Sequence, residues 1–349
     1  MKITSTPFGK IKDGRPVQLF TLSNDRQVTV KVTNYGCTVT AIEMPDRRGA
    51  IGNIVCGFEK LDDYLSGQYL NSYPYFGCVV GRYANRISKG KYTIDGVEYR
   101  GVVNNGENHL HGGLTGFDRK LWTPEIIETP DLVGVKMSYL SPDQEEGYPG
   151  NLKVSCTYSL DHENNLTISY EAETDQATII NLTNHTYFNL TGGKDNILNH
   201  GLRLTAKKIT EARELIPTGK ILPVDGSPFD FTKKKTLGRD LPSLPEGYDQ
   251  NFVIDHEAGK LVEAGCLSES NSGREVWVYT TQPGMQLYTG YWIPELIIDG
   301  LKKFGKYSGV ALETQHYADS PNHDNFPSTL LRPGEKYKET TVYRFSVNE

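Results

Sequence analysis

Residues 181–190 gather side chains that can bind a polar ligand and transfer protons. Alternate residues of a β-strand point to opposite faces of its sheet. If this stretch is a strand, one face carries polar or amphipathic residues, namely Asn181, Thr183, His185, Tyr187 and Asn189. The opposite face is more apolar and carries Leu182, Asn184, Thr186, Phe188 and Leu190. This pattern predicts a strand that lines a polar pocket, and a half-exposed strand facing bulk water is the alternative.

A second candidate is Glu313, which lies in the otherwise uncharged residues 309–317. A buried carboxylate costs free energy unless it is paired or hydrogen-bonded. Burial also raises its pKa above the reference value of about 4.3, toward the range that suits a general base. A buried glutamate that only pairs with an arginine is the structural alternative.

His109 and His111 would share one face of a strand, and their spacing is also one that metal ligands use. A metal site would need more ligands, and neither His316 nor His323 lies in a recognisable ligand motif. We therefore predict no metal site. The following glycines, residues 112–113, are expected to let the backbone turn sharply beside a ligand.

Three further segments carry groups that suit a ligand rich in hydroxyls. Residues 81–87 include Arg82, Asn85 and Arg86, residues 247–252 include Asp249, and residues 282–290 include Gln286. Arginine can hold a sugar hydroxyl or a neighbouring carboxylate, and a surface salt bridge is the alternative for each arginine. Amides and carboxylates bind hydroxyls while aromatic faces cover C–H groups, so the segments together predict a small-molecule pocket.

The sequence has no glycine-rich phosphate loop, no G-x-S-x-G elbow and no cysteine in a nucleophile setting. These absences disfavour nucleotide cofactors and serine hydrolase chemistry. One acid and one base, acting without a cofactor, remain as the predicted catalytic groups.

Short strands joined by turns must position these side chains, because the chain has 35 glycines, 18 prolines and 21 tyrosines and almost no helical periodicity. The clearest hairpin joins residues 91–94 to 97–99 through Asp95 and Gly96, which supply the positive φ values of a tight turn. A second hairpin pairs residues 154–160 with 166–172. Other predicted elements are strands at 27–33, 133–139, 275–281 and 340–347, one or two helical turns at 60–65, and long ordered loops at 216–245.

The sequence as a whole predicts one all-β domain over residues 1–349, with hydrophobic and charged fractions of 37% and 23% that are ordinary for a folded soluble protein. A net charge of −6 argues against nucleic acid as a partner, because phosphate binding needs a basic face. No apolar run resembles a signal peptide or approaches the roughly 18 residues of a membrane span. We expect a cytoplasmic location and five reduced cysteines.

These segments, in this order, resemble the aldose 1-epimerase (galactose mutarotase) family. The resemblance extends from residues 34–37 to residues 331–335, and its most specific parts are residues 81–87, 110–113, 145–150, 181–190 and 312–315. It implies an antiparallel β-supersandwich with an open cleft for the sugar. It also implies an isomerase without a cofactor that interconverts the α and β anomers of free hexoses such as galactose and glucose.

The resemblance assigns roles to the matching positions. His185 is the expected general acid and Glu313 the expected general base. The expected sugar-binding residues are Asn85, Arg86, His111, Tyr187, Asp249 and Gln286. Arg82 is the weaker candidate of the two arginines, and nearby carboxylates are expected to keep more of His185 protonated.

Three other functions remain open at this point. A hexose-6-phosphate 1-epimerase would need additional basic residues in the cleft, and the motifs supply only Arg82 and Arg86. A sugar-binding module without catalysis would not need the acid–base pair. The third is a glycosidase or lyase acting on oligosaccharides. Hydrolysis would need two carboxylates about 5–9.5 Å apart, for which Asp249 and Glu313 are the candidates. The expected partner is a small aldose, with no nucleic acid and no membrane, and the expected assembly is a monomer, with a dimer as the alternative.

Overall fold

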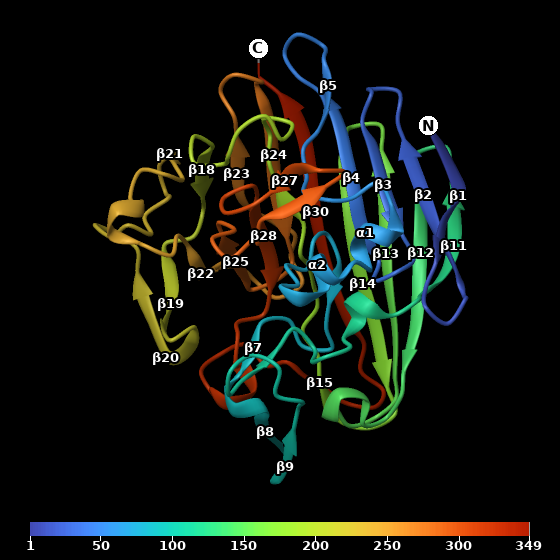
Figure 1. Ribbon diagram of the computed structural model, residues 1–349. Helices are drawn as coiled ribbons and strands as arrows, with labels where there is room; N and C mark the ends of the chain where they lie inside the picture. The colour runs from blue at the N-terminus through green and yellow to red at the C-terminus, as the bar shows by residue number, and fades with distance from the viewer. Residues whose placement is uncertain (349) are drawn as a thin grey trace.

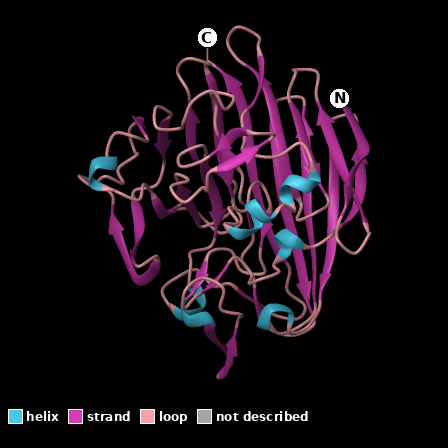
Figure 2. Cartoon of the chain, viewed as in Figure 1, coloured by secondary structure: helices cyan, strands magenta, loops and turns pink. Residues whose placement is uncertain are grey.

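The structure is a computed structural model that describes residues 1–348. Strands make up most of its regular structure, and the helices are short pieces between them (Figure 2). The strands of each sheet pair antiparallel. The prediction of an antiparallel all-β fold is therefore confirmed.

The largest sheet has nine strands, and its long strands run through the height of the molecule (Figure 1). In spatial order these are β11 (Thr123–Glu128), β12 (Leu132–Ser141), β13 (Leu152–Asp161), β14 (Asn165–Thr174), β30 (Tyr337–Val347), β24 (Arg274–Thr280), β23 (Val262–Ser268), β18 (Gly201–Leu204) and β21 (Lys235–Thr236). β30 pairs with β14 on one side and with β24 on the other. It therefore joins two halves of the sheet that are far apart in the sequence.

A six-stranded sheet carries many of the candidate functional residues. Its order is β17 (Tyr187–Phe188), β28 (Val310–Gln315), β25 (Gly284–Tyr288), β22 (Asp249–Val253), β19 (Lys208–Arg213) and β20 (Ile216–Pro223). A five-stranded sheet contacts β12 and β13 and consists of β1 (Lys2–Lys10), β2 (Pro16–Ser23), β3 (Thr29–Thr33), β4 (Thr38–Pro45) and β5 (Ile51–Asn53).

Small elements complete the regular structure of the described residues. The two-stranded sheets are β7 (Arg86–Ile87) with β10 (His109–Leu110), β6 (Val79–Val80) with β16 (Thr183–Asn184), β8 (Lys91–Ile94) with β9 (Val97–Arg100), β15 (Thr178–Ile179) with β29 (Leu330–Leu331), and β26 (Leu296–Ile298) with β27 (Leu301–Phe304). The helices are α1 (Leu61–Tyr64) and α2 (Gly67–Asn71), with single 3-10 turns at Ser88–Gly90, Phe117–Arg119, Glu145–Gly147, Leu241–Ser243 and Ser320–Asn322.

The apolar core draws residues from all three large sheets. On β13 the alternate residues Leu152, Val154, Cys156, Tyr158 and Leu160 are buried in it, as the two-residue period of a strand requires. Each large apolar side chain buried in this way contributes about 1.5–3 kcal/mol. One shared core supports the interpretation of residues 1–349 as a single domain, which stays a prediction.

Both predicted hairpins are confirmed. β8 and β9 are joined by Asp95 and Gly96, whose φ values are 50° and 80°. β13 and β14 are joined by a turn in which Oδ1 of Asp161 accepts backbone N–H groups of Glu163 and Asn165, at 2.8 and 2.9 Å. The strands predicted at 27–33, 133–139, 275–281 and 340–347 and the helical turn at 60–65 are also present.

Two sequence predictions need correction. Residues 181–190 are not one strand, because β16 pairs with β6 and β17 pairs with β28 in a different sheet. Residues 216–223 form β20, which pairs with β19, so this part of the predicted loop region is a strand. β16 and β17 pair with strands that are distant in the sequence. β20 follows a two-residue turn in which Glu214 and Leu215, rather than glycine or asparagine, have positive φ values. Local composition reveals neither feature.

Candidate active site

A cavity of ≈ 410 Å³ opens on the polar face of the six-stranded sheet. Seven of the eight predicted site residues line it: Asn85, Arg86, His111, His185, Tyr187, Asp249 and Glu313. The eighth, Gln286, lies in an adjoining small hollow and donates from Nε2 to Oδ1 of Asp249 at 2.5 Å. The structure therefore brings together segments that are spread over most of the chain.

Strand register explains why the residues of the six-stranded sheet share one face. Gln286 on β25 lies directly opposite Glu313 on β28. Tyr187 on β17 and Tyr288 on β25 both lie opposite Ala311, two residues before Glu313 and therefore on the same face. The small Ala311 leaves room between the two tyrosine rings, whose centroids are 5.9 Å apart.

His185 and Glu313 form a close buried pair at the base of the cavity. Nε2 of His185 lies 3.6 Å from Oε2 of Glu313, and the two side chains are 5% and 3% exposed. The backbone on either side of His185 is fixed, because its N–H donates to Cys78 O and its carbonyl accepts from Gly77 N–H. Among the described residues, neither Nδ1 of His185 nor Oε2 of Glu313 has a hydrogen-bond partner. Buried polar atoms without partners are rare, and both residues line a cavity that can hold a ligand.

Burial determines the protonation of this pair. It lowers the pKa of His185 to about 4, and it raises the pKa of Glu313 well above the ordinary value, with the negative charge of Asp249 adding to the rise. The expectation that nearby carboxylates keep His185 protonated is therefore wrong, because desolvation dominates. Burial therefore favours the neutral form of the pair, in which Glu313 holds the proton and His185 does not.

His111 is held as a neutral hydrogen-bond donor. Its Nδ1 accepts the backbone N–H of Asn85 at 3.0 Å, and the backbone N–H of His111 donates to the carbonyl of Asn85. Burial also lowers its pKa well below the ordinary value. A neutral imidazole whose Nδ1 accepts a hydrogen bond carries its proton on Nε2. His111 therefore presents an N–H group to the cavity.

The same tautomer decides whether a metal fits. Ligand atoms of His111, His185 and Glu313 lie within 4.8 Å of one another, a cluster compact enough for a cation. A zinc ligand must offer a lone pair, but Nε2 of His111 carries a proton and its Nδ1 lone pair is already used. Two lone-pair donors remain, which is fewer than a catalytic zinc site needs.

His109 does not share a face with His111, contrary to the sequence expectation. β10 ends at Leu110, and His111 has a φ of 52°, so the chain turns between the two histidines. His109 instead bonds Val102 O through Nδ1 and Tyr148 Oη through Nε2, at 2.6 and 2.5 Å. It is a buried structural residue.

The two arginines have different environments. Arg86 lines the cavity and donates from Nε to Oδ1 of Asn105 at 3.2 Å. Arg82 is buried and donates to the carbonyl oxygens of Ser141, Pro142 and Pro149. The surface salt bridge is thus wrong for Arg82, which is structural, and Arg86 is the arginine that can reach a ligand.

All ten of residues 181–190 are buried, so the alternative of a strand facing bulk water is wrong. Of the polar face, only His185 and Tyr187 reach the cavity. Asn181 donates to the carbonyls of Ala84 and His316, and Asn189 donates to those of Asp195 and Ser308. These amides satisfy backbone carbonyls of neighbouring segments and are therefore structural.

Sequence reasoning missed several lining residues, among them Tyr75, Asn105, Tyr288 and Trp292. The ring of Tyr75 stacks on His185 with centroids 5.9 Å apart and an interplanar angle of 22°. Tyr75 and Trp292 lie in connections between strands, where no periodicity marks a facing direction. Only Tyr288 carried a signal, because it follows Gln286 at the two-residue spacing of a strand.

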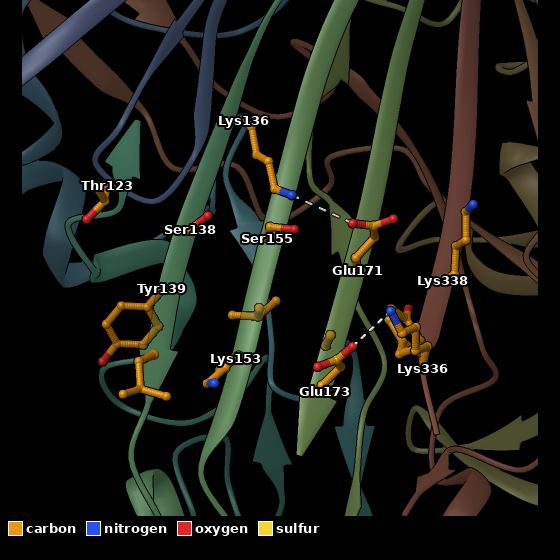
Figure 3. Close-up of a pocket in the computed structure, with 14 residues that line it drawn as sticks. Thr123, Lys136, Ser138, Tyr139, Lys153, Ser155, Glu171, Glu173, Lys336 and Lys338 are labelled. Atoms are coloured by element: carbon orange, nitrogen blue, oxygen red, sulfur yellow. Dashed lines mark ion pairs between the residues drawn. The ribbon is translucent and has the colours of Figure 1, made fainter. Parts of the chain in front are cut away.

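A larger hollow of ≈ 590 Å³ lies on the outer face of β12, β13, β14 and β30 (Figure 3). Its carboxylates are tied to lysines, with Lys136 Nζ 3.8 Å from Glu171 Oε2 and Lys336 Nζ 3.1 Å from Glu173 Oε1. Figure 3 shows the Lys136–Glu171 pair reaching across the strand that lies between β12 and β14. The hollow contains no histidine or buried carboxylate, so it offers no acid–base pair.

A family model described as Aldose 1-epimerase matches residues 18–344. The chain belongs to the aldose 1-epimerase family. Galactose mutarotase of Sus scrofa is 44% identical to it over 357 residues, covering 99% of both chains. Aldose 1-epimerase of Escherichia coli strain K12 is 33% identical over 342 residues, covering 95% of this chain and 96% of the relative.

Solved structures of aldose 1-epimerase relatives share the fold. Galactose 1-epimerase from Lactobacillus acidophilus NCFM superposes with a TM-score of 0.86 at 29% identity, covering 100% of this chain and 99% of the other. The GalM/aldose epimerase homologue from C. elegans gives a TM-score of 0.83 at 30% identity, covering 95% and 99%. The predicted galactose mutarotase-like fold is therefore confirmed for this aldose 1-epimerase family member. Every helix among the described residues is too short or too polar to cross a membrane.

Proposed function

We propose that the chain interconverts the α and β anomers of free, uncharged hexoses such as galactose and glucose, with Glu313 as general base and His185 as general acid. The observation that carries the proposal is the buried His185–Glu313 pair, 3.6 Å apart at the base of a cavity lined by amides and hydroxyl-bearing side chains. The names of the relatives, galactose mutarotase and aldose 1-epimerase, support the same reaction.

The reaction opens and closes the sugar ring. Glu313 as carboxylate removes the proton of the C1 hydroxyl, the C1–O5 bond breaks, and His185 donates a proton to O5. The open aldehyde then turns about the C1–C2 bond. Ring closure on the other face of the aldehyde reverses both proton transfers and returns the pair to its starting form.

The protonation of the His185–Glu313 pair agrees with this cycle of ring opening and closure. Both the reactive form, with Glu313 ionised and His185 protonated, and the neutral form contain a single shared proton. Ring opening moves that proton from His185 to Glu313 by way of the sugar. It therefore converts the charge-separated form into the neutral form that burial favours, which lowers the free energy of the ring-opened state.

The remaining residues are proposed to bind the sugar. Nε2–H of His111 and the guanidinium of Arg86 supply hydrogen-bond donors, and Asn85 lines the same cavity with its Oδ1 accepting the backbone N–H of Arg86. Asp249 supplies an acceptor and is oriented by the amide of Gln286. Tyr187 covers a C–H face of the ring with its aromatic face.

The charges of the lining favour an uncharged sugar over a hexose 6-phosphate. Arg86 is the one arginine or lysine among the lining residues, which also include the carboxylates of Glu246, Asp249 and Glu313. A phosphate would meet net negative charge and lose its hydration without adequate compensation. This observation disfavours the phosphorylated substrate, and the acid–base pair disfavours a module that only binds sugar.

We also propose that the protein acts in the cytoplasm as a monomer and without a cofactor. The five cysteines, all in the described part of the chain, are buried free thiols, which suits a reducing compartment.

The test is the approach of fresh α-D-galactose and α-D-glucose to equilibrium, followed by optical rotation near neutral pH. Faster approach to the same final rotation supports the proposal, and comparison of the sugars ranks the substrates. An unchanged rate with every free aldose would overturn it. Parallel reactions with glucose 6-phosphate test the charge argument, because the proposal expects little acceleration there.

A further inference from the structure

Three buried side chains near the proposed catalytic pair hold four polar atoms without a hydrogen-bond partner among the described residues. These atoms are Oγ1 of Thr183, Oδ1 of Asn251, and both Oε1 and Nε2 of Gln315. Thr183 and Gln315 are 0% exposed, and Asn251 is 4% exposed. Buried polar atoms without partners are rare, so four of them on three residues need an explanation. We call Thr183, Asn251 and Gln315 the inner polar cluster.

Strand register places Thr183 beside Gln315. β16 contacts β28, and His185 Nε2 lies 3.6 Å from Glu313 Oε2. Where two segments run antiparallel, the residue two positions before His185 lies beside the residue two positions after Glu313. These residues are Thr183 and Gln315. Just beyond them, side-chain hydrogen bonds join the same two segments, so the register continues.

Gly284 lets Asn251 reach toward Gln315 from the other side. Gly284 on β25 lies directly opposite Gln315 on β28. A Cβ atom at Gly284 would lie 2.6 Å from Oδ1 of Asn251 and 2.9 Å from the ring of Tyr317. Nδ2 of Asn251 donates to Thr210 Oγ1 at 3.4 Å, which leaves its oxygen over the glycine. The three members of the cluster therefore approach one another.

The inner polar cluster adjoins the carboxylate of Glu313. Gln315 follows Glu313 by two residues on β28, so both side chains lie on the same face of the strand. Oε2 of Glu313 is buried and also lacks a hydrogen-bond partner in the described chain. No residue of the cluster is among those that line the ≈ 410 Å³ cavity, so the cluster lies on the inner side of this carboxylate.

Water is the ligand that suits this cluster. A buried water typically makes about three hydrogen bonds to polar groups that would otherwise stay unsatisfied. The cluster offers the hydroxyl of Thr183, the amide oxygen of Asn251 and the whole amide of Gln315. Its three side chains are uncharged and supply both donors and acceptors, as a water molecule requires.

We propose that the inner polar cluster binds one buried water that donates a hydrogen bond to Glu313, with Gln315 as the positioning residue that holds this water. Nε2 of Gln315 donates to the water oxygen, whose two O–H groups donate to Oε2 of Glu313 and Oδ1 of Asn251. The hydroxyl of Thr183 donates to the water or to Oε1 of Gln315.

The water supports the reactive form of the general base. A hydrogen bond donated to a carboxylate favours its ionised form, which is the form that removes the C1 proton. Because a carboxylate oxygen accepts more than one hydrogen bond, the water and the C1 hydroxyl can bind Glu313 together. This role in the reaction rests on the proposed function, whereas the binding of the water does not.

A high-resolution crystal structure of the protein tests the water directly. We expect a density peak about 2.7–3.2 Å from both Nε2 of Gln315 and Oε2 of Glu313. A direct Gln315–Asn251 hydrogen bond, or no density at this position, would overturn the proposal whether or not the protein is active. If the protein accelerates no free aldose, the proposed function fails, and the density peak still supports the water site.

Gln315→Met and Thr183→Val test the link to Glu313, because both keep the side-chain size and remove hydrogen-bonding groups. We expect Gln315→Met to lower kcat for galactose by roughly 10-fold and to change KM by less than 2-fold. KM stays because the lost bond supports the base and does not contact the sugar. Thr183→Val should lower kcat in the same direction by a smaller factor.

Thr178→Val is the matched control. Thr178 on β15 (Thr178–Ile179) is also 0% exposed with no partner for Oγ1 in the described chain, but it belongs to neither the cavity nor the cluster. It should leave kcat unchanged, which separates the cluster from the general effect of removing a buried hydroxyl. Unchanged kcat in both Gln315→Met and Thr183→Val, or an equal loss in Thr178→Val, would overturn the positioning role.

Discussion

At the scale of single residues, the proposed mechanism depends on one proton shared by two groups whose charged forms are both disfavoured by burial. His185 and Glu313 approach to 3.6 Å, and each has a buried atom without a hydrogen-bond partner in the described chain. A sugar hydroxyl and ring oxygen can supply those partners. The reactive charge-separated form is therefore expected mainly when substrate is bound.

Replacing Glu313 by glutamine should abolish turnover while sugar binding largely survives. Glutamine keeps the shape and a hydrogen-bonding oxygen but cannot accept the C1 proton, so we expect kcat to fall by about 10²–10⁴-fold. Polarimetry measures the rate and calorimetry the affinity. Glu171→Gln, in the hollow outside the active site, is the control and should keep full activity. Near-normal turnover in Glu313→Gln would rule out the assigned base.

The shared proton also predicts the pH dependence of kcat/KM. Activity requires one proton on the pair, so it falls on the acid side when a second proton binds and on the alkaline side when the only proton leaves. The pKa of His185 is lowered from 6.5 to about 4, and that of Glu313 is raised above 4.5. Activity should therefore persist from neutral pH well below pH 6.5. Rates measured from pH 4 to 9 check this, and an acid limb centred near 6.5 would contradict it.

At the scale of elements, local signals predicted the regular strands and missed the interrupted ones. The turn at Asp95 and Gly96 was predictable because its chemistry lies within two residues. Residues 181–190 carried the right two-residue pattern, and His185 and Tyr187 do share the cavity. The pattern could not show that β16 and β17 pair with different strands, since that depends on distant parts of the chain.

The sequence predicted the candidate site residues that lie in recognisable motifs. It did not predict those that lie in loops. His185, Glu313 and the sugar-binding residues lie in segments whose order resembles a family, so their positions followed from the sequence. Tyr75 and Trp292 reach the cavity from connections whose path is set by tertiary contacts. The protonation of His185 was mispredicted, because the degree of burial is not visible in a sequence.

The turn after β10 brings Gly112 close to the backbone of Gly81, and a substitution tests whether this close approach matters. Gly112 has a φ of 87°, and a Cβ atom there would lie 1.8 Å from the carbonyl oxygen of Gly81. We expect Gly112→Ala to lower the free energy of unfolding by about 2–5 kcal/mol and to displace His111, which reduces activity. Thermal unfolding and polarimetry measure the two effects.

Gly96→Ala is its matched control. Gly96 has a similar φ of 80°, but a Cβ atom there would meet nothing within 4 Å. In this variant the free energy of unfolding should fall by about 1–2 kcal/mol, because only the cost of the positive φ applies, and activity should be unchanged. Equal destabilisation of the two variants would show that the close approach at Gly112 does not matter.

At the scale of the whole molecule, Glu339 on β30 links stability to pH. Burial raises the pKa of its carboxyl from 4.5 to about 7, although Thr281 Oγ1 donates a hydrogen bond to it. Because the folded pKa is the higher one, the stability from its protonated form is complete below pH 4.5 and is lost as the pH rises through about 7. Relative to the unsubstituted protein, Glu339→Gln should gain about 1–3 kcal/mol between pH 5 and pH 8. Urea unfolding at both pH values measures this difference, and an equal difference at both would contradict it.

The central place of β30 in the nine-stranded sheet has a consequence for synthesis of the protein. β30 comprises residues 337–347, yet it alone connects β14 to β24. While a ribosome is still translating the chain, both of those strands must present an unpaired edge, and exposed edges invite pairing with other chains. The sheet can close only after residues 337–347 have left the exit tunnel, so nascent chains that stall before this point should be the aggregation-prone ones.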